Sequence, residues 1–158
     1  MLDLEWLNDN YKQLVNKLFV YKSPMLIPNS LIIHQQIICT LIIKNTDENQ
    51  TVYIYSDDFS KEFFEEKNLM NEIKKAKERG VLFCLSCSGV CQSRYLKEMF
   101  VVSENKPKLI ERIKEKEFSI NFLTNGTAVW LQEENNQESK SSVNDPKAAE
   151  KLIVAFYN

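Results

Sequence analysis

The chain has 158 residues, of which 44% are hydrophobic and 27% are charged, and it contains only three glycines. This composition is typical of an ordinary globular protein and excludes low-complexity, collagen-like and intrinsically disordered chains. The net charge of −2 also excludes the overall basic character of a dedicated duplex-binding protein. A chain of this length buries roughly 70% of its unfolded surface, so we expect a single domain with a sizeable core.

The N-terminal segment predicts a helix. Apolar residues recur at helical spacing over about the first eighteen residues, which indicates an amphipathic helix that packs on the rest of the chain. Early acidic residues argue against a secretory signal, and the longest apolar run, residues 31–43, is too short to span a bilayer. We therefore expect a cytoplasmic protein with reduced cysteines and no membrane partner. Residues 1–28 form a helical extension in this prediction, and residues 29–158 form an α/β domain.

A second helix follows two prolines. Pro24 and Pro28 interrupt the chain, and Asn29 or Ser30 can cap a helix that continues through Ile43. The many β-branched residues of this run leave a strand as the alternative.

The next segment predicts two parallel strands joined by a helix. Residues 52–56 are β-rich, and Ser60 can cap a helix that continues to Arg79 and ends at Gly80. Residues 81–86 are fully apolar, as in a buried central strand. A strand, a helix and a strand in this order form a βαβ unit, in which the strands are parallel.

A β-hairpin is the clearest feature of the C-terminal part. The Asn125-Gly126 pair is a strong turn signal, and residues 117–123 and 127–132 flank it as strands. The remaining elements are a short strand at residues 99–102, a helix at residues 107–116, a polar loop at residues 134–142 and a final helix that begins at Asp145-Pro146. Together these elements predict a mixed α/β sheet with helices on both faces.

The first hairpin strand has the spacing of a phospholipase D active-site motif, which reads His, any residue, Lys, four residues, Asp. In the sequence FSINFLTNG, Phe118 occupies the histidine position, Ile120 the lysine position and Asn125 the aspartate position. With the βαβ unit and the ending SVNDPKAAEKLIVAFYN, this segment makes residues 30–158 resemble the phospholipase D-like superfamily, and in particular its non-catalytic bacterial members. The resemblance implies that superfamily's mixed sheet with flanking helices.

The departures from the motif predict an inactive site. The chemistry of the family needs an imidazole nucleophile and an ammonium group that holds the phosphate, and neither Phe118 nor Ile120 provides one. We therefore expect no catalytic residues and a binding or scaffold subunit of a bacterial multi-protein system. Its expected partner is another protein, or a second copy of the chain, that covers the apolar cleft of the degenerate site; nucleic acid is a further candidate partner.

Cysteines suggest an alternative function. Cys84, Cys87 and Cys91 have the spacing C-x2-C-x3-C at the end of a predicted strand, and Cys39 or His34 could serve as a fourth ligand. The cluster could hold zinc or an iron–sulfur cluster, or act as a redox dithiol. The alternative is packing, because cysteine often serves as a small hydrophobic residue.

Two further groups of charged residues are candidates. Asp57 and Asp58 follow a predicted strand and could bind Mg²⁺, although such pairs more often form turns or cap helices. Residues 94–116 are net positive, which predicts a weak contact with a phosphate backbone. The candidate residues there are Arg94, Lys97, Lys106, Lys108 and Arg112.

Overall fold

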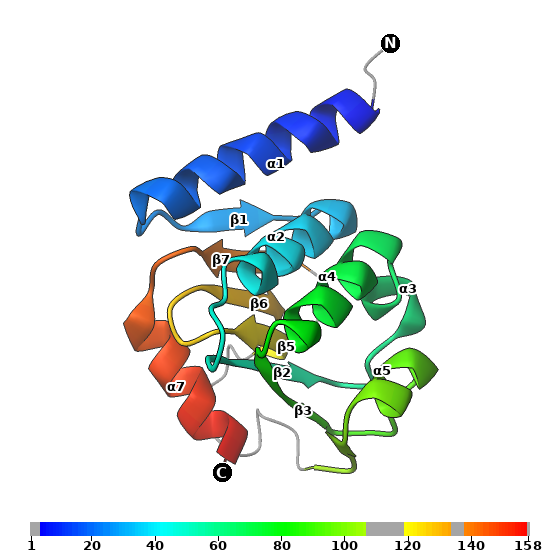
Figure 1. The fold of residues 1–158 in the computed structure, drawn as a ribbon. Coiled ribbons are helices and arrows are strands. Elements are labelled where there is room, and N and C mark those ends of the chain that lie inside the picture. The colour runs from blue at the N-terminus through cyan, green and yellow to red at the C-terminus, as the bar shows by residue number, and fades with distance from the viewer. Residues whose placement is uncertain (1–3, 107–118, 134–137, 158) are drawn as a thin grey trace.

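A computed structural model describes residues 4–106, 119–133 and 138–157, with the side chains of Leu4, Ser119 and Ile120 left out. Within these ranges the chain forms one seven-stranded sheet, with the strand order β1-β7-β6-β5-β2-β3-β4 (Figure 1). β2 pairs in parallel with β3, β3 pairs in parallel with β4, and the other neighbours are antiparallel. The strands are β1 (Ile27–Asn29), β2 (Thr51–Ser56), β3 (Leu82–Cys87), β4 (Val102–Ser103), β5 (Ser119–Thr124), β6 (Val129–Glu133) and β7 (Ser139–Ser142).

Helices cover both faces of the sheet, which confirms the expected mixed α/β fold (Figure 1). One face packs against α2, α3 and α4, and the other packs against α7. α1 lies outside α2, at the β1 end of the sheet (Figure 1). The helices are α1 (Leu4–Tyr21), α2 (Ile32–Lys44), α3 (Lys61–Phe64), α4 (Lys67–Glu78), α5 (Arg94–Met99) and α7 (Pro146–Tyr157).

Alternation along β2 separates two clusters of buried side chains. Val52 and Ile54 belong to the cluster beneath α2 and α4, whereas Tyr55 belongs to the cluster beneath α7 and Tyr53 packs against it. This follows from the two-residue period of a strand. α2 is central to the first cluster, and Ile38 and Ile42 are almost completely buried. A helix that is apolar on all sides is stable only when it is buried in this way. Its packing therefore favours a helix over the alternative strand, despite the β-branched residues.

The βαβ unit is confirmed, but its connection contains two helices rather than one. Glu66 begins the second helix, because its carboxylate oxygens accept hydrogen bonds from the backbone N–H groups of Asn68 and Leu69. The prediction of one continuous helix from Ser60 to Arg79 was wrong for this reason. Gly80 ends the unit's helical part as expected, with φ at +96°, a conformation in which glycine carries little steric cost.

Four further predictions differ from the structure. α2 begins without a side-chain cap from Asn29 or Ser30, since its N-cap residue is Leu31. Residues 94–99 form α5, so the predicted strand at residues 99–102 is reduced to β4. The predicted loop at residues 134–142 contains β7, and β1 crosses the expected boundary at residue 28. The predicted helix at residues 107–116 lies outside the described residues.

Candidate ligand-binding pocket

A pocket opens at the carboxyl end of β2, where ligands commonly bind in α/β sheets. Its cavity volume is about 390 Å³, within the size range of small-molecule sites. The start of α2, the segment from β2 into α3, and strands β5 and β6 supply its lining, which consists of Ile32, Ser56, Asp57, Asp58, Ser60, Glu62, Phe63, Phe64, Asn121, Trp130 and Gln132.

Buried amide side chains form one wall of the pocket. Asn121 accepts a hydrogen bond from the backbone N–H of Asp57 at 3.0 Å and donates to Gln132 Oε1 at 2.6 Å. Gln132 in turn donates to Gln35 Oε1 at 3.1 Å, and the Trp130 indole N–H donates to the same oxygen at 3.1 Å. We call Asn121, Gln132 and Gln35 the amide chain. Because each member is buried and bonded, the chain holds α2, β5 and β6 in a fixed arrangement.

The segment from β2 into α3 gives the pocket negative charge. Asp57, Asp58 and Glu62, which we call the acidic rim, contribute three carboxylates, and no lysine, arginine or histidine is among the described lining residues. Asp57 Oδ1 accepts a short hydrogen bond from the Ser88 hydroxyl. Partial burial, and then the charge of Asp57, raise the pKa of Asp58 above its ordinary value. The rim therefore favours hydrogen-bond donors and cations over anions.

The backbone of the rim is strained at Phe59. This residue has φ at +52°, a left-handed conformation that costs a residue with a Cβ roughly 1–2 kcal/mol. Burial of its ring against Phe64, at 5.0 Å between centroids, and a hydrogen bond from its N–H to Ser56 Oγ stabilise the conformation. Such strain is concentrated at functional loops, and here it lies within the segment that presents the acidic rim.

The segment that we compared with a phospholipase D motif is only partly described. Phe118 and the side chain of Ile120 lie outside the described residues, so the proposed partner across their cleft stays a prediction. Asn125 lies in the turn that follows the carboxyl end of β5. Asn121 lies within β5, in its amino-terminal half. Its Oδ1 accepts hydrogen bonds from the backbone N–H groups of Thr127 and Ala128. This confirms the hairpin and gives Asn125 a structural role.

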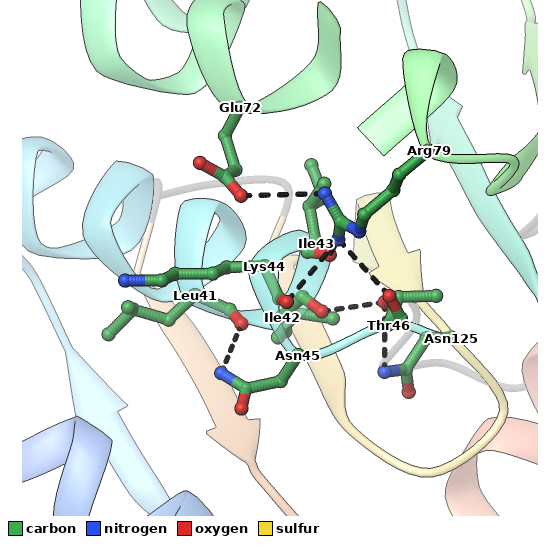
Figure 2. A network of polar contacts seen from close by, with 9 residues as sticks. All are labelled: Leu41, Ile42, Ile43, Lys44, Asn45, Thr46, Glu72, Arg79 and Asn125. Carbon is green, nitrogen blue, oxygen red and sulfur yellow. Dashed lines mark hydrogen bonds and ion pairs between the residues drawn. The ribbon is translucent and has the colours of Figure 1, made fainter. Parts of the chain in front are cut away.

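Asn125 also joins a polar network at the end of α2 (Figure 2). Its Nδ2 donates to Thr46 Oγ1 at 3.2 Å, and that hydroxyl donates to the carbonyl of Ile42. Arg79 donates to the carbonyls of Ile43, Lys44 and Thr46 (Figure 2). These bonds add partners for carbonyls at and just after the carboxyl end of α2, where backbone bonding is incomplete; the carbonyl of Ile43 also accepts from the backbone N–H of Thr46.

Two cysteines of the C-x2-C-x3-C pattern, Cys87 and Cys91, form hydrogen bonds with the backbone. The Cys87 thiol donates to the carbonyl of Gly89, and the Cys91 thiol donates to the carbonyl of Ser93. Burial raises the pKa of Cys87 to about 11 and also raises that of Cys91. Neutral thiols are poor nucleophiles and poor metal ligands. Among the described residues, no group of three or more histidine, cysteine or acidic side chains is placed to hold a metal ion.

The zinc or iron–sulfur alternative stays a prediction that metal analysis of the purified protein would test. The suggested fourth ligands have other surroundings. His34 stacks on Tyr11 with ring centroids 4.0 Å apart and lies 3.1 Å from Asn8 Oδ1, so it helps to hold α1 on α2. Cys39 is fully buried in α2, and this burial raises its pKa well above the ordinary value.

The described basic candidates do not form an unpaired patch. Arg94 pairs with Glu98 at 3.7 Å, and Lys97 pairs with Glu104 at 3.3 Å. Lys106 is exposed. The two other candidates, Lys108 and Arg112, lie outside the described residues.

Sequence reasoning identified Asp57 and Asp58 but missed the amide chain. Its members are far apart in the sequence: the bonded residues Gln35 and Gln132 are separated by 97 positions. A signal was nevertheless present, because Gln35 and Gln36 interrupt an otherwise apolar helix, and a polar residue inside an apolar pattern requires a buried partner.

The chain matches no protein-family model and no curated protein sequence. Among solved structures it is similar to TrmBL2, an archaeal chromatin protein whose structure is described as showing a novel mode of DNA binding. The TM-score is 0.57 and the sequence identity is 15%. The match covers 98% of this chain but only 61% of TrmBL2. The two proteins therefore share a fold over nearly the whole of this chain.

In the described part of the chain, no helix is long and apolar enough to cross a membrane.

Proposed function

We propose that this chain is a non-catalytic binding domain of the phospholipase D-like type, which acts as a subunit of a multi-protein system and holds a small neutral or cationic ligand in the pocket beside β2. The observation that carries the proposal is the acidic rim. Asp57, Asp58 and Glu62 line a cavity of suitable size, and the amide chain fixes the lining residues Asn121 and Gln132.

Without a cation bound between its carboxylates, the rim repels an anionic phosphodiester. A phosphoryl-transfer site stabilises developing negative charge with cations. A carboxylate about 5 Å from a phosphate would instead repel it by roughly 3 kcal/mol at an effective dielectric constant of about 20. Together with Phe118 and Ile120 at the nucleophile and lysine positions, this supports a binding role.

A thermal-shift comparison tests the proposed ligand class. We expect cationic amines or neutral polyols to stabilise the protein, and matched phosphate esters to have no effect. Asp58→Asn and Glu62→Gln should weaken the stabilisation by amines, because each removes a negative charge from the rim. Glu150→Gln, an exposed acid on α7 at the other face of the sheet, is the matched control. Stabilisation by phosphate esters that depends on Asp58 would contradict the proposal.

Activity assays test the catalytic part of the proposal independently. We expect no turnover of lipid or nucleic-acid phosphodiesters by the purified chain. Turnover that persists through purification and is abolished by Asn121→Ala or Asn125→Ala would show that a working site exists. Because Asn121 and Asn125 both have structural roles, far-UV circular dichroism must show that these variants remain folded.

Nucleic acid is a second candidate ligand, because the structure of the similar protein TrmBL2 is described as showing a mode of DNA binding. The proposed contact is a phosphate contact near Arg94, Lys97 and Lys106. Fluorescence anisotropy with a DNA duplex at low salt should detect weak binding that decreases steeply as salt increases. Alanine at these three positions should weaken it, whereas Lys74→Ala and Lys75→Ala on α4 serve as controls. Equal losses in both sets would place the contact elsewhere.

A further inference from the structure

Exposed apolar side chains are concentrated at the N-terminal end of the described chain. Thirteen large apolar side chains are exposed among the described residues, and eight of them lie within residues 6–33. They lie on α1, on the segment between α1 and β1, and at the start of α2, which lie together at one end of the molecule (Figure 1). Scattered exposed apolar residues are normal, but a concentration of this kind indicates an interaction surface.

α1 has two different faces. Its inner face holds it on the domain, because Val15 is buried, Tyr11 stacks on His34 and Asn8 lies in hydrogen-bond contact with the same ring. Trp6, Leu14 and Tyr21 follow at intervals of about two helical turns and are 58%, 53% and 79% exposed. We call these three residues the outer face of α1.

The charges of α1 are distributed asymmetrically. Glu5 and Asp9 lie in its first two turns, whereas Lys12 lies near its middle and Lys17 lies in its second half. Asp9, Lys12 and Lys17 are exposed and form no ion pair with another described residue. The helix is thus acidic at one end and basic at the other, with Leu14 near its middle.

We propose that the outer face of α1 binds the same face of a second copy of this chain, with the two helices antiparallel. A two-fold axis near Leu14 places Trp6 near the partner's Tyr21 and Asp9 near the partner's Lys17, so apolar residues meet apolar residues and opposite charges meet. A parallel arrangement would oppose like charges at every position. The contact is the same patch on both subunits, which closes the assembly as a dimer. The proposal does not depend on the ligand of the pocket.

The oligomeric state in solution tests this surface. Light scattering after gel filtration should give a dimer for the unaltered chain and a monomer for Leu14→Glu, with the same far-UV circular dichroism. Val154→Glu is the matched control, because Val154 is 54% exposed on α7 and the variant should remain dimeric. A monomeric unaltered chain would overturn the proposal. So would a dimer that withstands Leu14→Glu but dissociates with Phe118→Asp, which would instead place the contact at the degenerate site.

Charge reversal tests the orientation of the helices. Asp9→Lys and Lys17→Glu should each increase the dimer dissociation constant by about tenfold or more, since each creates two like-charge pairs across the two-fold axis. The double variant should recover most of the affinity. Asp9 and Lys17 are roughly 12 Å apart along one helix, so recovery cannot arise from a contact within one chain. A parallel dimer predicts little change in either single variant, and that result would overturn the antiparallel arrangement.

Discussion

Replacement of Gln35 by methionine tests the amide chain. Methionine has a similar length and flexibility to glutamine but lacks the carbonyl oxygen that accepts from Trp130 Nε1 and Gln132 Nε2. Both donors belong to buried side chains, and each buried donor without a partner costs roughly 1–3 kcal/mol. Allowing for partial relaxation, we expect Gln35→Met to lower the free energy of unfolding by about 2–4 kcal/mol. The variant should still fold, since domains typically have about 5–15 kcal/mol of stability.

Urea denaturation followed by far-UV circular dichroism measures this loss. For a slope of about 2 kcal/mol per molar urea, the midpoint should fall by roughly 1–2 M with the slope unchanged. Gln13→Met is the matched control, because Gln13 is exposed on α1 and the change should have little effect.

A double variant separates lost hydrogen bonds from altered packing. Trp130→Phe removes the indole donor, so Gln35→Met should cost less in that background than in the unaltered chain. A loss below about 0.5 kcal/mol for Gln35→Met, or full additivity with Trp130→Phe, would refute the view that the amide chain stabilises the junction of α2, β5 and β6.

Two further predictions follow from other contacts. Burial lowers the pKa of His34, so below the ordinary histidine pKa of about 6.5 the unfolded chain takes up a proton more readily than the folded chain. Stability should therefore decrease as the pH falls through this range, and the urea midpoints of His34→Gln should show a smaller decrease; equal pH dependence would contradict this assignment. Arg79→Lys should cost about 1–3 kcal/mol, because Arg79 Nη2 bonds the three carbonyls while Nη1 pairs with Glu72, and lysine has only one terminal nitrogen (Figure 2). Lys75→Arg on α4 is its control, and equal unfolding midpoints in the two variants would contradict the role of Arg79.

The central part of the fold could be predicted because local sequence and packing agree there. Residues 52–56 and 81–86 are strongly apolar or β-rich, and Gly80 and Asn125-Gly126 mark a helix end and a turn. Each of these signals is supported by a tertiary contact in the same place, as in the pairing of β2 with β3. The final helix is likewise preceded by Asp145, whose carboxylate accepts a hydrogen bond from the backbone N–H of Ala148.

The edge of the sheet could not be predicted, because there the local sequence does not indicate the strands that the packing produces. β1 has the sequence IPN and β7 has the sequence SKSS, and neither has the apolar or β-branched content of a typical strand. They become strands because β7 pairs with β6 and β1 then pairs with β7. Backbone hydrogen bonds supplied by a neighbour determine these elements, and such bonds leave little trace in the side-chain pattern.

The pocket and the cysteine segment belong to one structural unit, and this bears on how the pocket could be controlled. The backbone N–H of Gly89 donates to the carbonyl of Asp57, and that of Gln92 donates to the carbonyl of Asp58 at 2.7 Å. The residues between them include Cys91, which is buried. Any change that displaces Cys91 must therefore move the backbone that carries two carboxylates of the acidic rim. The lining amides of Asn121 and Gln132 are already bonded within the amide chain, so the three carboxylates of the rim are the charged groups of the described lining that can select a ligand.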